Sequence, residues 1–350
     1  MSQMPRFTGG WTPPGAPEVR VRTLVALALG ALVLALSLQA WWVLTPGPAV
    51  RGGPRVVELP RDSRFLEIVT ALDRAQVIRS PVAFGLLALL RGSMRSLKAG
   101  EYQIPQGASS LAVLRLLEGG QVLQHPVVFR EGSSLAEVAR LLEAEGLARA
   151  EDVARVARDA LFLRQLDVRA DSLEGYLFPD TYQLVKGMTA EEILARMVAR
   201  LGERLTPGVL AAAETRGLSL HQLLTLASII EKEAVERSEM PLISAVFWNR
   251  LRKDMPLQAD PTVQYAVGRE RQRLTRDDLV VDHPYNTYRR SGLPPGPIAS
   301  PGLHAIQAAV NPAAVGYLYF VAIDDRRHKF STTLADHNAA VARARLARAR

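Results

Sequence analysis

An unbroken apolar run stands near the N-terminus of the chain. The stretch from Thr23 to Leu44 contains no charged residue, and a helix of this length reaches across a hydrocarbon core of about 30 Å. Trp41 and Trp42, at its far end, suit the headgroup level. We therefore predict one transmembrane helix over residues 23–44. A cleaved signal peptide is the alternative, which we favour less because the run is long and residues 38–40 fit a cleavage site poorly.

A pattern of strand, polar turn and amphipathic helix recurs beyond this run. VVELPRDSRFLEIVTALDRAQV begins at Val56, VVFREGSSLAEVARLLEAEGL begins at Val127, and a partial copy, GASSLAVLRLL, begins at Gly107. Each copy predicts a short strand or turn followed by a helix with an apolar stripe. Ser63 and Ser133 align in the repeat and are the predicted helix caps. The repeats are therefore small βα units.

The first repeat belongs to a longer pattern. A helix around residues 82–90 and a strand over Leu97–Ile104 complete the order strand, helix, helix, strand, which resembles the LysM fold, a module that binds N-acetylated sugars of cell-wall glycans. The alternative is a capped amphipathic helix that recurs because it packs well. After Leu147 helices dominate, and a Pro- and Gly-rich stretch precedes a last strand and helix. We predict an α+β fold organised as a disordered cytoplasmic tail (residues 1–22), the transmembrane helix (23–44), a linker (45–55), a LysM-like module (56–125) and a mainly helical domain with a small sheet (126–350).

Charge and cysteine content limit the possible partners and the possible cellular compartment. The net charge of +8 and the pI near 10.0 raise the question of nucleic acid, but the basic residues form no face with interleaved aromatics, so we expect no nucleic-acid partner. Basic residues flank both ends of the apolar run and do not set its orientation. A long C-terminal domain favours export of that domain. The absence of cysteine permits an oxidising compartment without requiring one.

Familiar catalytic motifs are missing. The chain has no cysteine and none of the patterns HExxH, GxSxG or SxxK, and its six histidines lack the spacing of metal ligands. We therefore predict neither a metal nor another cofactor. Carboxylate, amide and hydroxyl side chains remain, and these are the groups that cleave glycosidic bonds.

The densest candidate is ASIIEKEAVERSEMP, which begins at Ala227. Glu233 lies three residues after Ile230 and continues the apolar stripe of the preceding helix, whereas Glu231 is rotated about 160° away. A carboxyl group at the end of a buried stripe loses solvation, which raises its pKa and suits a general acid. The alternative is that both glutamates are solvated partners of Lys232 and similar neighbours.

Three further segments carry polar side chains in turn-like sequence, and two of them add aromatic rings. SLEGYLFPDTY contains Glu174, LQADPT contains Gln258 and Asp260, and YNTYRRSGLPPGPIASPG contains Tyr285 and Asn286. Proteins hold sugars with stacked rings and hydrogen bonds to hydroxyl groups. Each segment alone also fits a structural turn, but their combination favours a glycan site.

At these residues the chain resembles the endolytic murein transglycosylases, the MltG or YceG-like proteins of bacteria. The matching stretches are LEGYLFPDTY, ASIIEKEA, VFWNRLRKDMPLQADPTVQYAVG, YNTYRRSGLPPGPIASPG and YLYFVAIDDRRHKFSTTLADHN. The resemblance implies a single-pass protein of the cytoplasmic (inner) membrane whose C-terminal domain is periplasmic or otherwise extracytoplasmic. Peptidoglycan glycan strands would be its substrate, and peptidoglycan synthases at the membrane its expected partners.

The resemblance also implies a reaction. Such enzymes cleave the β-1,4 bond between N-acetylmuramic acid (MurNAc) and N-acetylglucosamine (GlcNAc) in nascent strands and leave 1,6-anhydro-MurNAc ends. The family's catalytic glutamate corresponds to Glu233, the residue that the helix-face argument also prefers. Substrate-binding or supporting roles are expected for Gln258, Asp260, Tyr285, Asn286 and Glu174. A non-catalytic glycan-binding scaffold and a hydrolase that uses water are the alternatives.

Overall fold

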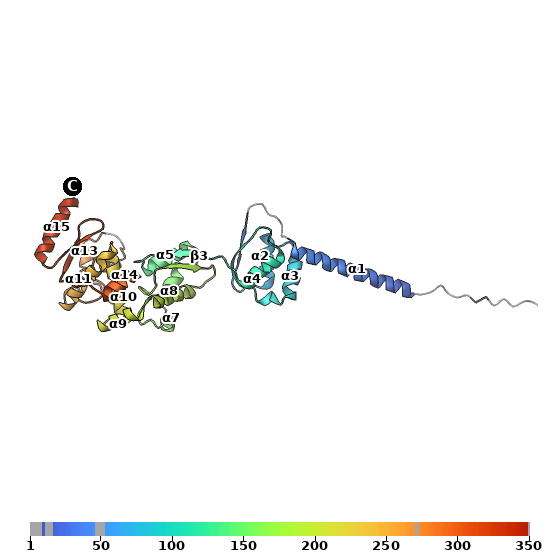
Figure 1. Cartoon of the computed structure of the whole chain (residues 1–350), viewed down its shortest axis with the longest axis horizontal. Coiled ribbons are helices and arrows are strands. Elements are labelled where there is room, and N and C mark those ends of the chain that lie inside the picture. Colours follow the sequence, from blue (N-terminus) through green and yellow to red (C-terminus); the bar gives the residue numbers. More distant parts are fainter. Residues whose placement is uncertain (1–8, 11–16, 46–52, 270–272, 349–350) are drawn as a thin grey trace, which may run out of the picture. The chain divides into compact units, whose positions relative to one another are not determined.

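The protein divides into two compact units, Met1–Leu123 and Gln124–Arg350. The computed structural model describes residues 9–10, 17–45, 53–269 and 273–348 (Figure 1). Each unit has its own hydrophobic core.

The N-terminal unit begins with the long apolar helix α1 (Pro17–Leu44). Its segment Val21–Leu44 is the one stretch among the described residues that is long and apolar enough to cross a membrane. The helix starts before the predicted position, so residues 17–22, which we predicted to be disordered, are helical and that prediction was wrong. Proline is compatible with the first turn of a helix, where its missing N–H has no partner to lose. Most of the predicted tail and linker lies outside the described residues.

The rest of this unit is a small α/β module. Strand β1 (Arg55–Leu59) pairs antiparallel with β2 (Gly100–Ile104), so that Val57 lies opposite Tyr102. Between them lie α2 (Phe65–Arg74), α3 (Pro81–Leu90) and the 3₁₀ turn η1 (Ser93–Arg95), and α4 (Ser110–Gly119) follows. The predicted order strand, helix, helix, strand is therefore present. The likeness of this module to LysM stays a prediction.

The predicted helix caps are wrong by one residue. Helix α2 is capped at Arg64, whose backbone N–H donates to the Glu67 carboxylate at 2.7 Å. Helix α5 (Leu135–Ala144) is capped by Ser134. Ser63 instead donates its hydroxyl to the Pro60 carbonyl oxygen. Each cap lies directly before its helix, three residues ahead of a glutamate that completes a capping box.

The C-terminal unit is mainly helical with two separate antiparallel strand pairs. Strand β3 pairs antiparallel with β4, and β5 with β6. Residues 150–165, in the region predicted to be mainly helical, contain two short helices, α6 and α7. In chain order the elements are β3 (His125–Val128), α5, α6 (Ala150–Val156), α7 (Ala160–Gln165), β4 (Thr181–Leu184), α8 (Ala190–Arg204), α9 (Pro207–Thr215), α10 (Leu220–Glu233), η2 (Arg237–Glu239), α11 (Met240–Arg252), α12 (Asp260–Ala266), α13 (Arg276–Leu279), α14 (Leu303–Val310), β5 (Tyr319–Ala322), β6 (His328–Ser331) and α15 (Leu334–Arg348).

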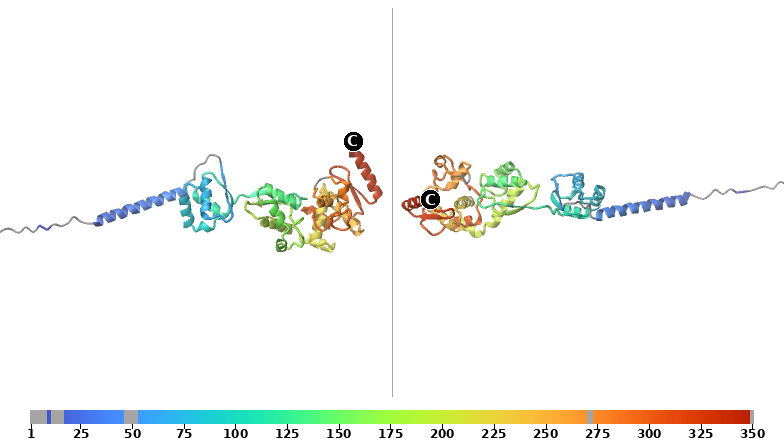
Figure 2. Two further views of the ribbon diagram at one scale, coloured as in Figure 1. Left: turned by 180° about the vertical axis from the view of Figure 1, so that it is seen from behind. Right: turned by 90° about the horizontal axis from the view of Figure 1, so that it is seen from above.

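Helix α10 lies at the centre of this unit. Ser219 caps it in a capping box with Gln222, and every residue from Leu223 to Ile230 is buried. It packs against α14 and α11, and α11 in turn contacts β5, which also contacts α15. The hairpin and α15 can be followed in orange and red in Figure 2. The helix ends at Glu233, so its core packing fixes the position of that residue.

Candidate active site

Glu233 is the last residue of α10, and its side chain is half-buried at the end of that helix. Loss of solvation, reinforced by the nearby charge of Asp260 and opposed by Arg250, raises the pKa of Glu233 to about 8. The carboxyl group therefore keeps its proton at neutral pH. This is the protonation state that a general acid requires.

A pocket of about 400 Å³ opens beside this carboxyl group. Its walls come from the end of α10, from α11, from the turn before α12, from the loop after α13, from strands β5 and β6, and from α15. The lining residues are Glu233, Arg250, Leu257, Gln258, Asp260, Tyr288, Phe320, Val321, Ala322, His328 and His337.

Arg250, on α11, holds several walls of the pocket together. Its side chain is 6% exposed. Its Nε donates to the Leu318 carbonyl oxygen at 2.7 Å, and its Nη1 donates to the Leu257 carbonyl oxygen at 2.9 Å and to Gln258 Oε1 at 3.1 Å. A planar guanidinium can bond several acceptors at once and keeps its charge. We did not predict Arg250, because a lone arginine in a helical pattern resembles a surface residue.

Gln258 has a left-handed backbone conformation, with φ of 51°. This region disfavours residues other than glycine. The conformation is held from both sides, because the Gln258 N–H donates to the Thr287 carbonyl oxygen at 3.0 Å while the side-chain oxygen accepts from Arg250. Such conformations cluster at functional sites. Gln258 was a predicted site residue, and the structure places it in the pocket with Glu233.

Asp260 supplies a second carboxylate to the pocket. It is the first residue of α12, and Tyr288 donates its hydroxyl to Asp260 Oδ1 at 2.5 Å. Burial and this hydrogen bond raise the pKa of Tyr288, so the phenol remains a donor. Asp260 was predicted at the site, whereas Tyr288 was not. The signal was present in the sequence, because Tyr288 is the second ring of the YNTY motif.

The other two predicted residues of this motif region lie outside the pocket lining. Asn286 is fully buried, and its Nδ2 donates to the carbonyl oxygens of Leu279 at 3.0 Å and Val281 at 2.8 Å. Its Oδ1 accepts from the Tyr288 N–H at 3.0 Å. The Tyr285 ring packs against another tyrosine ring instead of the pocket. Asn286 thus orders the loop that presents Tyr288, which is a supporting position.

Glu174 also lies away from the pocket lining. Its side chain is 6% exposed, and Oε1 accepts from the Leu135 N–H at 3.0 Å at the start of α5. The Tyr265 hydroxyl approaches Oε2 at 3.4 Å. A carboxylate at a helix N-terminus satisfies free N–H groups and the helix dipole. This contact joins the Glu174 loop to α5.

Glu231 and Glu233 contact different parts of the protein, as expected because they point to different sides of the helix. Glu231 Oε2 accepts from the Gly302 N–H at 2.9 Å, at the start of α14. Burial raises the pKa of Glu231 as well, although this hydrogen bond opposes the rise. Glu231 is not among the residues that line the pocket. Its contact is with a helix terminus.

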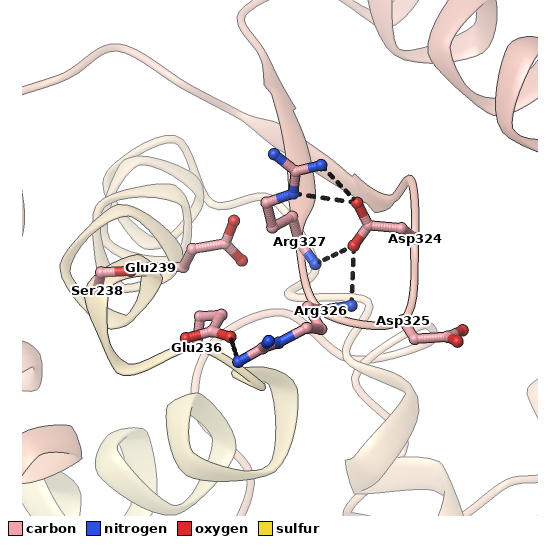
Figure 3. Close-up of a pocket in the computed structure, with 7 residues that line it drawn as sticks. All are labelled: Glu236, Ser238, Glu239, Asp324, Asp325, Arg326 and Arg327. Atoms are coloured by element: carbon pink, nitrogen blue, oxygen red, sulfur yellow. Dashed lines mark hydrogen bonds and ion pairs between the residues drawn. The ribbon is translucent and has the colours of Figure 1, made fainter.

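A second pocket of about 660 Å³ is lined mainly by charged side chains (Figure 3). Its charged side chains are mostly paired with one another: Arg326 contacts Glu236 at 2.6 Å, and Arg327 contacts Asp324 at 2.8 Å. Glu239 lines this pocket and binds Nδ1 of His328, a lining residue of the Glu233 pocket, at 2.7 Å. The two pockets are therefore neighbours across the contact between η2 and β6.

Metal ligands do not gather at either pocket. Within the part of the chain that the structure describes, no three His, Asp or Glu side chains are placed to hold a metal ion. The chemistry available from the residues present is proton transfer by Glu233, beside one further carboxylate and a buried guanidinium.

Comparison with known proteins connects the chain to a family. The model of the YceG-like family matches residues 57–343. A Bacillus subtilis (strain 168) protein named endolytic murein transglycosylase is 34% identical over 299 residues, which cover 81% of this chain and 83% of that protein. A protein of the same name from Streptococcus pneumoniae serotype 2 is 32% identical over 318 residues, which cover 82% of this chain and 57% of that protein.

A solved structure extends the likeness to three dimensions. The 2.6 Å crystal structure of a YceG-like protein from Listeria monocytogenes is 34% identical in sequence and superposes with a TM-score of 0.58. The match covers 82% of this chain and 98% of the other. Sequence and fold therefore agree on the same group of proteins.

Proposed function

The chain belongs to the YceG-like family of endolytic murein transglycosylases, and from this premise we propose that it cleaves the MurNAc–GlcNAc β-1,4 bond within nascent peptidoglycan strands. The product would carry a 1,6-anhydro-MurNAc end. The observation that carries the proposal is the half-buried carboxyl group of Glu233 in the pocket wall, whose pKa loss of solvation raises to about 8.

One carboxyl group suffices for the two proton transfers. Protonated Glu233 donates to the glycosidic oxygen as the bond between that oxygen and C1 of MurNAc breaks, which releases the GlcNAc 4-hydroxyl. The resulting carboxylate then accepts the proton of the MurNAc 6-hydroxyl, whose oxygen forms the new bond to C1. Glu233 ends protonated, and no water is consumed. The nucleophile belongs to the substrate.

The remaining pocket residues have supporting roles in this proposal. Gln258 and Asp260 face the same space as Glu233 and are candidates for hydrogen bonds to sugar hydroxyl or acetamido groups. Arg250 holds Gln258 in its left-handed conformation, and Tyr288 orients Asp260. Tyr285, Asn286 and Glu174 would act by shaping the surrounding loops.

Asp260 also gives a specific reason to test a hydrolase. Inverting and retaining glycosidases use two carboxyl groups, and Asp260 lies in the Glu233 pocket. Its Oδ1 accepts a hydrogen bond from Tyr288, which favours a positioning role over that of a nucleophile. A glycan-binding scaffold is the non-enzymatic alternative, although simple binding does not require a carboxyl group that stays protonated at neutral pH.

Mass spectrometry of the products separates these three functions. The full-length chain in detergent would be incubated with nascent, uncrosslinked glycan strands, and the new ends would be identified. Anhydro-MurNAc ends support the transglycosylase. Reducing ends would reject the transglycosylase and support a hydrolase. Intact strands that still bind the protein would support the non-catalytic scaffold.

The location proposed for this activity is the outer face of the cytoplasmic membrane. Helix α1 would be the single-pass anchor, with the C-terminal unit periplasmic or otherwise extracytoplasmic and the LysM-like module (residues 56–125) bound to glycan. Peptidoglycan synthases would then be near enough to be partners, and cleavage would terminate strand growth. Protease digestion of intact spheroplasts tests the orientation: degradation of the C-terminal unit supports it, and protection until lysis contradicts it.

A further inference from the structure

Helix α3 has an apolar face that the N-terminal unit does not cover. Its sequence, PVAFGLLALL, contains no polar side chain. Ala83, Phe84 and Ala88 on one side are buried in the core of the unit. The other side carries the exposed residues Val82 (65% exposed), Leu86 (45%), Leu89 (61%) and Leu90 (84%).

These exposed side chains form one stripe. At about 100° per residue, positions 82, 86, 89 and 90 fall within an arc of about 100° on the helix surface. Contiguous exposed apolar surface of this kind marks a site of contact with protein or membrane. A helix of ten residues is about 15 Å long, too short to span a bilayer of about 30 Å. If lipid covers α3, the helix therefore lies along the surface.

The position of α3 within its unit favours lipid. Helix α3 contacts α1, the proposed anchor. Arg79, just before α3, has its guanidinium carbon 5.5 Å from the ring centre of Trp41 and 5.3 Å from that of Trp42, near the end of α1. Tryptophan rings at the end of a transmembrane helix lie at the headgroup level. The start of α3 is therefore at that level too.

The charge of the segment also fits a membrane surface. Residues 79–100 include Arg79, Arg91, Arg95 and Lys98 and no aspartate or glutamate. Arg91 is paired with Glu118 at 3.0 Å, and the segment itself remains basic. Basic side chains beside an apolar helix face are typical of helices that bind anionic bilayers.

We infer that α3 is an interfacial membrane helix, which inserts its Val82–Leu86–Leu89–Leu90 face into the anionic lipid surface around the end of α1. This rests on the proposed anchor role of α1. The N-terminal unit would then be bound to the bilayer by two elements, one that crosses it and one that lies in its surface.

Fluorescence quenching in vesicles tests this inference with the full-length chain. Because the chain has no cysteine, single-cysteine variants can be labelled at one position each with a nitrobenzoxadiazole dye. The informative variants are Leu86→Cys and Leu89→Cys. Gln103→Cys, exposed on β2, is the matched control, and Leu32→Cys reports on α1. The vesicles would contain phosphatidylcholine and phosphatidylglycerol with bromines at shallow or deep acyl positions.

The expected result is a different depth for each helix. Dyes at Leu86 and Leu89 should shift to shorter emission wavelength and be quenched most by shallow bromines, since an interfacial helix lies about 5–10 Å into the headgroup and acyl boundary. The Leu32 dye should be quenched most by deep bromines, and the Gln103 dye by neither.

Three results would overturn the inference. Deep quenching at Leu32 without quenching on α3 would leave the anchor intact and remove the interfacial helix. A blue shift on α3 without bromine quenching would show that protein, from a second copy or the C-terminal unit, covers the face. Absence of quenching at Leu32 would reject the anchor itself and the inference with it.

Discussion

Replacing Glu233 by glutamine should abolish cleavage and stabilise the protein at neutral pH. Glutamine has the shape of the protonated acid but cannot ionise. In the folded protein the pKa of this carboxyl group is raised to about 8, from an ordinary value of 4.5. The stabilising contribution of the protonated form is therefore complete below pH 4.5 and is lost progressively as the pH rises to about 8. The variant removes this loss.

The size of the effect follows from the pKa difference. Each pKa unit corresponds to about 1.4 kcal/mol, so burial of Glu233 costs about 3 kcal/mol at pH 7 and almost nothing at pH 4. For a domain of this size, about 1 kcal/mol changes the melting temperature by about 2–4 °C. Glu233→Gln should therefore melt about 6–12 °C above the wild type at pH 7 and within about 2 °C of it at pH 4.

Scanning calorimetry of the full-length chain in detergent measures this difference, and the muropeptide assay measures cleavage. Glu231→Gln is the matched control on the same helix, and it should retain most of the cleavage because Glu231 contacts the start of α14 and not the pocket. An equal or lower melting temperature for Glu233→Gln at pH 7, or an equal gain at both pH values, would refute the burial argument. Near-normal turnover in Glu233→Gln would refute the catalytic assignment.

Four further substitutions, the last of them a control, test the pocket and the fold around it. Arg250→Lys keeps the charge but loses the planar donor set, and it should lower the free energy of unfolding in urea by about 2–4 kcal/mol; a change near zero contradicts this. Tyr288→Phe removes the hydrogen bond to the pocket carboxylate and should lower kcat about tenfold with little change in KM; an unchanged kcat would reject the positioning role. Gly175→Ala should destabilise the fold by about 2–4 kcal/mol, because φ is +79° and the new Cβ would meet Pro297. Gly217→Ala, with φ of +73° and open space, should cost only about 1–2 kcal/mol in the same unfolding experiment, and equal losses would exclude the clash.

Local patterns were sufficient to predict the central helix and its candidate acid. The apolar run before Glu233 indicated a buried helix, and the 100° rotation per residue separated Glu233 from Glu231. Both features depend only on neighbours in sequence. The same holds for the order strand, helix, helix, strand in the N-terminal unit, although the start of α1 and the cap of α2 were predicted wrongly.

Arg250 and Tyr288, also in the pocket, could not be predicted in this way, because their positions depend on contacts between segments that are distant in sequence. Arg250 becomes buried only because Leu318 and Leu257 supply carbonyl oxygens from other segments. Tyr288, and not Tyr285, reaches the pocket because the buried Asn286 side chain fixes the turn between them. Nothing within the YNTY motif distinguishes its two rings without that turn.

The order in which the pocket walls occur along the chain has a consequence for synthesis. Glu233 and Arg250 come early, but the wall formed by Phe320, His328 and His337 comes more than 80 residues after Glu233 in the sequence. A nascent chain that has not yet reached His337 therefore has Glu233 without the complete pocket beside it. The pocket beside Glu233 is therefore complete only when β5, β6 and α15 have folded against α10 and α11.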